Sequence, residues 1–250
     1  MNTTRKVWLT LAAFGLGMAI LACSCGSITS LFNSTPTTAP LPPQPSPTTP
    51  PIPTVPTVPL TTSNLPYYDD FSDPNSGWDV YNESFGSAGY QDGYYFVTAT
   101  GSSEAVALYA KNYDNTTIDV DAEPVSGPSD NNFEYGVSCR VQSNLDSYDF
   151  SISADGYFAV YVVTDGGSTF TSLLQGDEYQ YSDAINQDLS LNHLTVTCNG
   201  SHLTFAVNGQ VLYDGQDSTF SNGQIGLFTD IFDETTPDEV HFDDLLVSAP

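Results

Sequence analysis

Positive charge is almost absent from this sequence. It has 4 Lys and Arg against 30 Asp and Glu, which gives a formal net charge of −26. Proteins that bind nucleic acid use Lys and Arg to neutralise phosphates and release counterions. A chain with so few cations cannot do this, so a nucleic-acid partner is excluded. Only Lys111 and Arg140 lie beyond residue 6, so the chain should repel anionic surfaces.

The hydrophobic run near the N-terminus is short. Residues 7–22 carry no charge, but these 16 residues fall below the about 20 that a transmembrane helix needs. Because Arg5 and Lys6 precede the run, it has the pattern of an export signal. The run ends at Ile20-Leu21-Ala22-Cys23, which resembles the lipobox of bacterial lipoproteins, with an aliphatic residue at −3 and a small one at −1. Leu21 departs from the small residue that is usual at −2.

This resemblance implies a lipoprotein signal peptide over residues 1–22 and a lipid anchor on Cys23. Cys25 is a second candidate for acylation, and an ordinary signal peptide with an incidental cysteine is the alternative. Residues 23–66 form the predicted linker, since residues 34–66 are rich in Pro and Thr and favour an extended polyproline conformation of roughly 100 Å. The predicted location is therefore outside the membrane, at the cell surface, at the end of a lipid-anchored stalk.

Cysteine is also scarce, with four residues in all. Cys139 and Cys198 are the two in the C-terminal part, and each lies inside a predicted strand. An exported protein with two such cysteines usually pairs them, so we predict a disulfide, which would close a long loop. The three scattered His residues lack the spacing of zinc ligands, which disfavours a zinc site.

Helical periodicity is missing from residues 67–250, which instead alternate in short runs between turn signals. Turns that accept positive φ are predicted at Asp92-Gly93, Asp155-Gly156, Asn199-Gly200 and Asn208-Gly209. The last two separate residues 193–198, 201–207 and 210–213 into a three-stranded meander. Further strands are expected over residues 94–99, 105–110, 117–122, 133–141, 148–153, 157–163, 170–174, 224–229 and 240–247. With 40% hydrophobic residues this predicts an all-β, two-sheet antiparallel sandwich.

Several motifs of this head resemble the concanavalin A-like jelly-roll superfamily, and most closely its laminin-G-like and 3-keto-disaccharide-hydrolase-like domains on bacterial lipoproteins. They are Asp69-Asp70-Phe71-Ser72-Asp73-Pro74, Ser76-Gly77-Trp78, Tyr135-Gly136-Val137-Ser138-Cys139-Arg140, Asn208-Gly209-Gln210, Gly226-Leu227-Phe228 and Phe242-Asp243-Asp244-Leu245. The resemblance covers nearly all of the head and implies a jelly-roll sandwich. It also implies that the first and last strands pair, which would bring Phe71 near Phe242.

Strand alternation predicts which side chains face away from the core. Over residues 133–141 the odd positions are apolar, and over residues 157–163 Phe158, Val160 and Val162 should point inward. Over residues 105–110 the inward set is predicted to be Val106, Leu108 and Ala110. The opposite faces could form a glycan platform, because tyrosine rings stack on sugars and charged groups bond hydroxyls. Its predicted ligand-binding residues are Tyr109, Lys111, Glu134, Arg140, Tyr157 and Tyr161.

A catalytic alternative rests on three alternating carboxylates, Asp119, Asp121 and Glu123. They resemble the Glu-x-Asp-x-Glu strand of family 16 glycosidases, which provides a general acid and a nucleophile. Asp119 replaces the nucleophilic Glu with a shorter side chain, and Pro124 follows immediately. A solvated strand face is the simpler interpretation.

Structural Ca²⁺ is a further hypothesis, because hard oxygen ligands suit this ion. If the terminal strands pair, Asp69, Asp70 and Asp73 approach Asp243 and Asp244. An acidic loop adds carboxylates at Asp230, Asp233, Glu234, Asp238 and Glu239.

The sequence thus predicts a surface lipoprotein that displays a noncatalytic carbohydrate-binding or adhesion module for glycans or wall polymers. Two alternatives stay open. One is a glycoside hydrolase of the family 16 type, and the other is a structural or protein-binding head without glycan affinity. No sequence feature sets an oligomeric state.

Overall fold

The fold is taken from a computed structural model, which describes residues 65–101, 103–232 and 236–250. The predicted signal peptide, Cys23, Cys25 and residues 23–64 of the predicted linker lie outside these residues, as do Asp233 and Glu234. A search for helices able to cross a membrane finds none within the described ranges.

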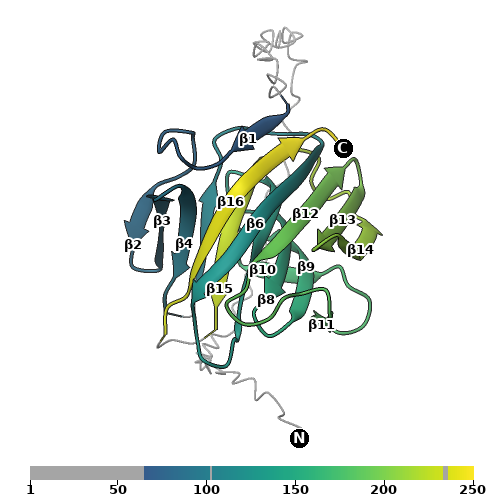
Figure 1. Ribbon diagram of the computed structural model, residues 1–250. Helices are drawn as coiled ribbons and strands as arrows, with labels where there is room; N and C mark the ends of the chain where they lie inside the picture. The colour runs from purple at the N-terminus through teal and green to yellow at the C-terminus, as the bar shows by residue number, and fades with distance from the viewer. Residues whose placement is uncertain (1–64, 102, 233–235) are drawn as a thin grey trace, which may run out of the picture. The chain divides into compact units, whose positions relative to one another are not determined.

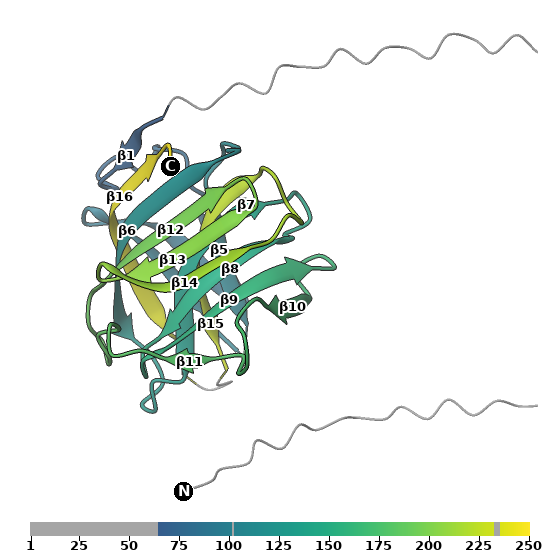
Figure 2. The same cartoon turned by 90° about the vertical axis from the view of Figure 1, so that its right-hand side faces the viewer.

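The described residues form two antiparallel sheets that pack as a sandwich (Figures 1 and 2). The nine-stranded sheet has the order β14 (Gln210–Gln216), β13 (His202–Val207), β12 (Asn192–Asn199), β6 (Thr116–Ser126), β16 (Glu239–Ser248), β4 (Tyr94–Ala99), β3 (Gly86–Gln91) and β2 (Tyr81–Glu83), with β1 (Tyr67–Asp69) paired to β16. The seven-stranded sheet has the order β10 (Thr169–Ser172), β9 (Tyr157–Thr164), β8 (Ser147–Ser153), β7 (Phe133–Val141), β15 (Gln224–Ile231) and β5 (Glu104–Leu108), with β11 (Gln180–Tyr181) paired to β9. The predicted all-β jelly-roll sandwich is confirmed.

Alternation along the strands builds the core between the sheets. In β6 the buried positions Ile118, Val120 and Ala122 alternate with half-exposed Thr117, Asp119 and Asp121. The core is rich in aromatic residues, and burial of their apolar surface stabilises the fold. Tight turns join neighbouring strands where Asn208 and Gly209 adopt φ of 52° and 82°, as the sequence predicts.

The first and last strands pair, as the resemblance implies. Tyr67 lies opposite Val247, and Tyr68 donates a hydrogen bond to Asp244 Oδ1 at 2.5 Å. Phe71 and Phe242 both belong to the core.

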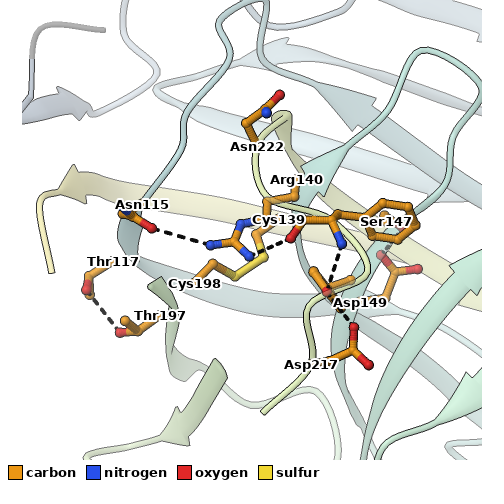
Figure 3. Close-up of a disulfide and its surroundings, with 12 residues drawn as sticks. Asn115, Thr117, Cys139, Arg140, Ser147, Asp149, Thr197, Cys198, Asp217 and Asn222 are labelled. Carbon is orange, nitrogen blue, oxygen red and sulfur yellow. Dashed lines mark hydrogen bonds between the residues drawn. A yellow bond between two sulfur atoms is a disulfide. The ribbon is translucent and has the colours of Figure 1, made fainter. Parts of the chain in front are cut away.

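The predicted disulfide is confirmed, and it joins the two sheets (Figure 3). Cys139 lies in β7 and Cys198 in β12. Next to the disulfide, the Arg140 side chain is only 2% exposed, and its guanidinium donates hydrogen bonds to the carbonyls of Gly200 and Phe220, each at 2.7 Å. Arg140 therefore holds surface loops to the end of β7.

The seven-stranded sheet is also partly covered on the face that points away from the core. Strands β7 and β8 are buried at every position. On the outer side of β9, Ala159, Tyr161 and Val163 form a second apolar cluster, and Tyr179 packs against it from the segment between β10 and β11. This face is therefore part buried floor and part open cleft.

The predicted orientation of residues 105–110 is wrong. Ala105, Ala107 and Tyr109 lie in the core, while Val106 and Leu108 point to the outer face. The run is apolar at every position from 105 to 110, so its pattern does not distinguish the two faces. Tyr109 takes the core side because its ring stacks on Tyr67, with ring centroids 4.6 Å apart.

Candidate functional site

A cleft of about 400 Å³ lies on the outer face of the seven-stranded sheet. Its floor comes from β5, β7 and β8 and consists of Glu104, Val106, Leu108, Ser138, Ser147 and Asp149. One wall is formed by Asp79, Tyr81 and Phe85, and the other by Val141, Leu145, Val163, Gly166 and Gly167. This volume lies within the range of small-ligand sites.

A glycine on a central strand lets the floor of the cleft pack closely. On β15, Gly226 lies between Leu108 of β5 and Ser138 of β7. A Cβ at Gly226 would lie 3.1 Å from Val106 Cγ2, which is tighter than an ordinary contact. The absence of a side chain on β15 thus lets the floor residues of β5 pack closely beside it.

A row of carboxyl groups crosses the same sheet face. Asp230 of β15 is the register partner of Glu104 on one side and of Glu134 on the other. Ser151 Oγ donates to Glu134 Oε2 at 2.6 Å, and Ser147 Oγ donates to Asp149 Oδ1 at 2.7 Å. No Lys or Arg ammonium or guanidinium forms an ion pair with any of these groups among the described residues.

Burial raises the pKa of every carboxyl in this row, because the charged form loses its hydration. Burial, together with a smaller effect of neighbouring Asp230 and Asp149, raises the pKa of Glu134 to about 8 against the lowering effect of the Ser151 hydrogen bond. The pKa values of Asp149 and Asp230 rise to about 6, and that of Glu104 rises well above its usual range. Near neutral pH, Glu134 is therefore mainly a neutral carboxylic acid.

The backbone is strained at one lip of the cleft. Leu145 has a φ of +70°, although its side chain is bulky and 44% exposed. Such a conformation is costly for a residue other than Gly, Asn or Asp. The loop that holds it is fixed by the hydrogen bond from Leu145 N to Gln142 O at 2.9 Å and by Gly166 N donating to Asp146 Oδ1 at 2.8 Å. Strain of this kind is a pointer to function.

The opposite lip is aromatic. Tyr81 and Phe85 have ring centroids 5.7 Å apart, and the Tyr81 hydroxyl donates to Val106 O at 3.1 Å. Phe85 is 42% exposed. The cleft thus places an aromatic wall and an aliphatic lip on either side of a floor that carries hydrogen-bonding groups.

The structure does not gather the predicted ligand-binding residues into one platform. Tyr109 lies in the core, Arg140 is bound to backbone carbonyls, and the Lys111 ammonium lies 5.4 Å from the ring centroids of Tyr67 and Tyr109. Tyr161 is covered by Phe170 and Tyr179, whereas Tyr157 is 39% exposed and meets Tyr181 edge to face. Of the six, Glu134 belongs to the carboxyl row beside the cleft.

The three candidate catalytic carboxylates lie on β6, in the other sheet. Asp121 Oδ1 is 2.6 Å from His193 Nδ1, and Asp119 accepts a hydrogen bond from Thr195 Oγ1 at 2.7 Å. Glu123 is exposed and lies opposite His241. None of them lines the cleft.

The carboxylates of the calcium hypothesis make local hydrogen bonds. Asp69 accepts from Phe71 N, Asp70 from Ser72, and Asp244 from Tyr68. In the part of the chain that is described, no group of three or more His, Cys, Asp or Glu is arranged to hold a metal ion. The Ca²⁺ site stays a prediction.

Sequence reasoning missed most of the cleft, including Asp79, Tyr81, Glu104, Leu145 and Asp149. One signal was available. Along residues 147–153 the odd positions are Ser, Asp, Ser and Ser, while the even positions are Tyr, Phe and Ile. This alternation indicates a strand with one apolar face and one face of small polar groups, which is the pattern of a site floor.

Comparison with known proteins identifies the fold. No protein-family model matches the chain, and no curated protein matches its sequence. Among solved structures, the carbohydrate-binding module CBM66 from Bacillus subtilis aligns with a TM-score of 0.56 and 16% identity over 69% of this chain and 96% of its own. A lichenase (β-1,3-1,4-glucanase) from a mouse hindgut metagenome aligns with a TM-score of 0.55 and 11% identity over 74% of this chain and 99% of its own. A Bacillus licheniformis β-glucanase aligns with a TM-score of 0.53 and 11% identity over 76% of this chain and 100% of its own. The chain therefore has a jelly-roll sandwich fold similar to the folds of these solved structures.

Proposed function

We propose that this chain is a surface lipoprotein whose head binds an uncharged glycan in the cleft between the Tyr81–Phe85 wall and Leu145. The observation that carries the proposal is the pairing of largely apolar walls with a floor that carries hydrogen-bonding groups in one cleft. Aromatic and aliphatic side chains pack on the C–H faces of sugar rings, and carboxyl and hydroxyl groups bond sugar hydroxyls. The two similar structures whose names describe a carbohydrate-binding module and a lichenase support the same ligand class.

Charge favours a neutral ligand. The cleft contains Asp79, Glu104 and Asp149, and the chain carries a formal charge of −26. An acidic polysaccharide would meet repulsion in the cleft and from the surface around it.

The floor supports binding without catalysis. Retaining and inverting glycosidases need two carboxyl groups with opposite roles, and their environments push the two pKa values apart. On this floor, burial raises the pKa of both Glu104 and Asp149. Two carboxyl groups whose pKa values are raised together are better suited to bonding sugar hydroxyls than to acting as an acid and a nucleophile.

The test is glycan-array binding by the purified full-length chain, followed by titration of each hit with Phe85→Ala and Phe170→Ala. Both rings are 42% exposed, but only Phe85 lines the cleft. We expect Phe85→Ala to weaken binding about tenfold, since a ring–sugar contact contributes roughly 1.4 kcal/mol. Phe170→Ala should leave the affinity unchanged. Equal losses in both variants would contradict the cleft as the site.

A glycoside hydrolase is the second candidate, and the raised pKa of Glu134 favours it, because a carboxylic acid that is neutral at pH 7 can act as a general acid. Product analysis on each array hit separates the two functions. Turnover that Glu134→Gln abolishes while binding persists would establish the enzyme. A blank array would instead favour the structural or protein-binding head.

The anchor is tested separately. Metabolic labelling of the full-length chain with a radioactive fatty acid should label the protein, and Cys23→Ser should remove the label while Cys25→Ser retains it. Label lost only in Cys25→Ser would move the anchor to that residue.

A further inference from the structure

A second hollow of about 370 Å³ lies beside the cleft, between the segments around residues 110–112, 141–143 and 222–224. Its polar lining consists of four amides and one hydroxyl, Asn112, Gln142, Ser143, Asn222 and Gln224, and no ionisable side chain lines it. In a chain with 30 carboxylates, a hollow lined only by neutral groups differs sharply in chemistry from the neighbouring cleft.

Two of these amides are held in fixed orientations. Gln142 Nε2 donates to Arg140 O at 2.8 Å and to Asn222 O at 2.7 Å, and Gln224 Nε2 donates to Tyr109 O at 2.9 Å. Because only the amide nitrogen can donate to a carbonyl, these contacts assign which end of each amide faces the backbone. Neither Oε1 accepts a hydrogen bond from any described residue. Both carbonyl oxygens are therefore pre-oriented acceptors for a ligand.

Asn112 adds an adaptable group at the edge of the hollow. Its side chain is exposed and makes no hydrogen bond within the described ranges, so it can both donate and accept. The backbone beneath is closely packed, because a Cβ at Gly223 would lie 2.4 Å from the carbonyl carbon of Arg140. The hollow thus combines a rigid base with free amide groups.

The hollow and the cleft meet at one residue and share one loop. Val141 lines both. In the loop that follows, Gln142 and Ser143 line the amide hollow, and Leu145 lines the cleft. A ligand that occupies both must pass beside this loop, with Val141 at the boundary.

We infer that the amide hollow is a second subsite for the same neutral glycan, so that the ligand is an oligosaccharide chain rather than a single terminal sugar. The inference rests on the proposed glycan binding in the cleft. Amides and hydroxyls form paired hydrogen bonds with neighbouring sugar hydroxyls without requiring a charge on the sugar. The cleft supplies the apolar contacts, and the hollow supplies neutral donors and acceptors for the next residues of the chain.

The experiment titrates the full-length chain by calorimetry with glucose and with β-1,3-1,4-glucan oligosaccharides of three to six residues, and with the corresponding ladder of any other neutral glycan that binds on an array. The variants are Asn112→Ala and, as a matched control, Asn199→Ala, which removes an exposed Asn at the end of β12 outside both hollows. We expect affinity to rise at least tenfold from the shortest ligand that binds to the longest. Asn112→Ala should weaken only the longer ligands, by about fivefold, which is the effect of one lost hydrogen bond.

A second readout observes the hollow directly. In amide NMR spectra, the side-chain NH₂ signals of Asn112 and Asn222 should shift with long ligands and stay in place with the shortest one, while the backbone amides of Gly166 and Gly167 shift with both. Binding that is independent of chain length, with no effect of Asn112→Ala and no shift of these NH₂ signals, would overturn the second subsite and leave the cleft intact. No binding to any glycan would overturn the proposed function and this inference together.

Discussion

At the scale of single residues, Leu145 combines exposure, an apolar side chain and a positive φ at the lip of the cleft. Asn tolerates this conformation better than Leu does, and it avoids the entropy cost of Gly. We expect Leu145→Asn to raise the free energy of unfolding by about 0.5–1 kcal/mol, because strain is relieved. Urea unfolding measures this gain, and glycan titration should show weaker binding, because the aliphatic lip is lost.

The matched control is Leu189→Asn. Leu189 is 49% exposed, is not among the residues with positive φ, and lies outside the cleft. It should change neither stability nor binding by a measurable amount. A loss of stability in Leu145→Asn would show that the leucine contributes packing that outweighs its strain.

Arg140 illustrates a residue whose role is structural. Its guanidinium donates to the carbonyls of Asp114, Gly200 and Phe220, so Arg140→Lys should leave some of these part-buried carbonyls without a donor. We expect the free energy of unfolding to fall by about 2–4 kcal/mol in urea titrations. Lys111→Ala, which removes an exposed cation, should stay within about 0.5 kcal/mol of the parent chain. Equal stability of Arg140→Lys and the parent would contradict this role.

The partner of a single residue was predictable where the composition leaves few possible partners. Cys139 and Cys198 were paired correctly because few cysteines leave few choices. The environments of Arg140 and Tyr161 were not predictable. Alternation along a strand shows that a side chain points away from the core, but it does not show whether a segment distant in sequence covers that side chain. The carbonyls around Arg140 come from residues 26–80 positions away in sequence, and Tyr161 is covered by Tyr179 from a segment without regular alternation.

At the scale of elements, the carboxyl row across β5, β15, β7 and β8 predicts a pH dependence of stability. Three carboxyl groups and three hydroxyls face Glu134, with no cation among them: Asp230, Glu104, Asp149, Ser151, Tyr179 and Tyr161. Folding raises the pKa of Glu134 to about 8, above its value in an unfolded chain. Between about pH 4.5 and 8 the folded state therefore binds more protons than the unfolded state.

The sign follows directly from this difference. Stability contributed by a group with a raised pKa is fully present below its unfolded pKa and is lost as pH rises through its folded pKa. We expect the free energy of unfolding to increase by roughly 2 kcal/mol or more from pH 8 to pH 5.5. Glu134→Gln should stabilise the protein at pH 8 and flatten the profile, whereas Glu83→Gln on exposed β2 should leave the slope unchanged. A stability maximum near pH 8 would contradict the protonated row.

The predictability of elements depends on their turns and side chains. The meander of β12, β13 and β14 was predicted because Asn199-Gly200 and Asn208-Gly209 mark its turns. Strand β3 was missed because its sequence, Gly-Ser-Ala-Gly-Tyr-Gln, has little strand propensity. It forms because β4 on one side and β2 on the other provide hydrogen-bond partners, and this tertiary effect is absent from the local pattern.

At the scale of the whole molecule, the disulfide joins the two sheets across a sequence separation of 59 residues. Closing a loop of this length stabilises the folded state by about 4 kcal/mol in the entropic description. We expect Cys139→Ala/Cys198→Ala to lower the free energy of unfolding by that amount in urea titrations, and dithiothreitol to have the same effect on the parent chain. A difference below about 1 kcal/mol would show that the packing between the sheets alone sets stability.

The arrangement of the whole molecule accounts for why the fold could be predicted from the sequence and the cleft could not. Alternation, turns and composition act locally and lead to a two-sheet sandwich. The cleft instead depends on which strands become neighbours, since Glu104, Asp149 and Tyr81 come from strands that meet only in the folded sheets. The position of the cleft is therefore determined by the order of the strands in the folded sheets.

The pairing of β1 with β16 has a mechanical consequence. Strand β1 contacts its partner through three register pairs and the Tyr68–Asp244 hydrogen bond, and it pairs with no other described strand. Tension on the chain ahead of Tyr67 reaches β16 through these contacts and the core through the Tyr67–Tyr109 ring stack. The strand should peel away at low force and release roughly 10 Å of chain before the sandwich bears the load. A head pulled from this end would thus lose one short strand first and keep the seven-stranded sheet intact.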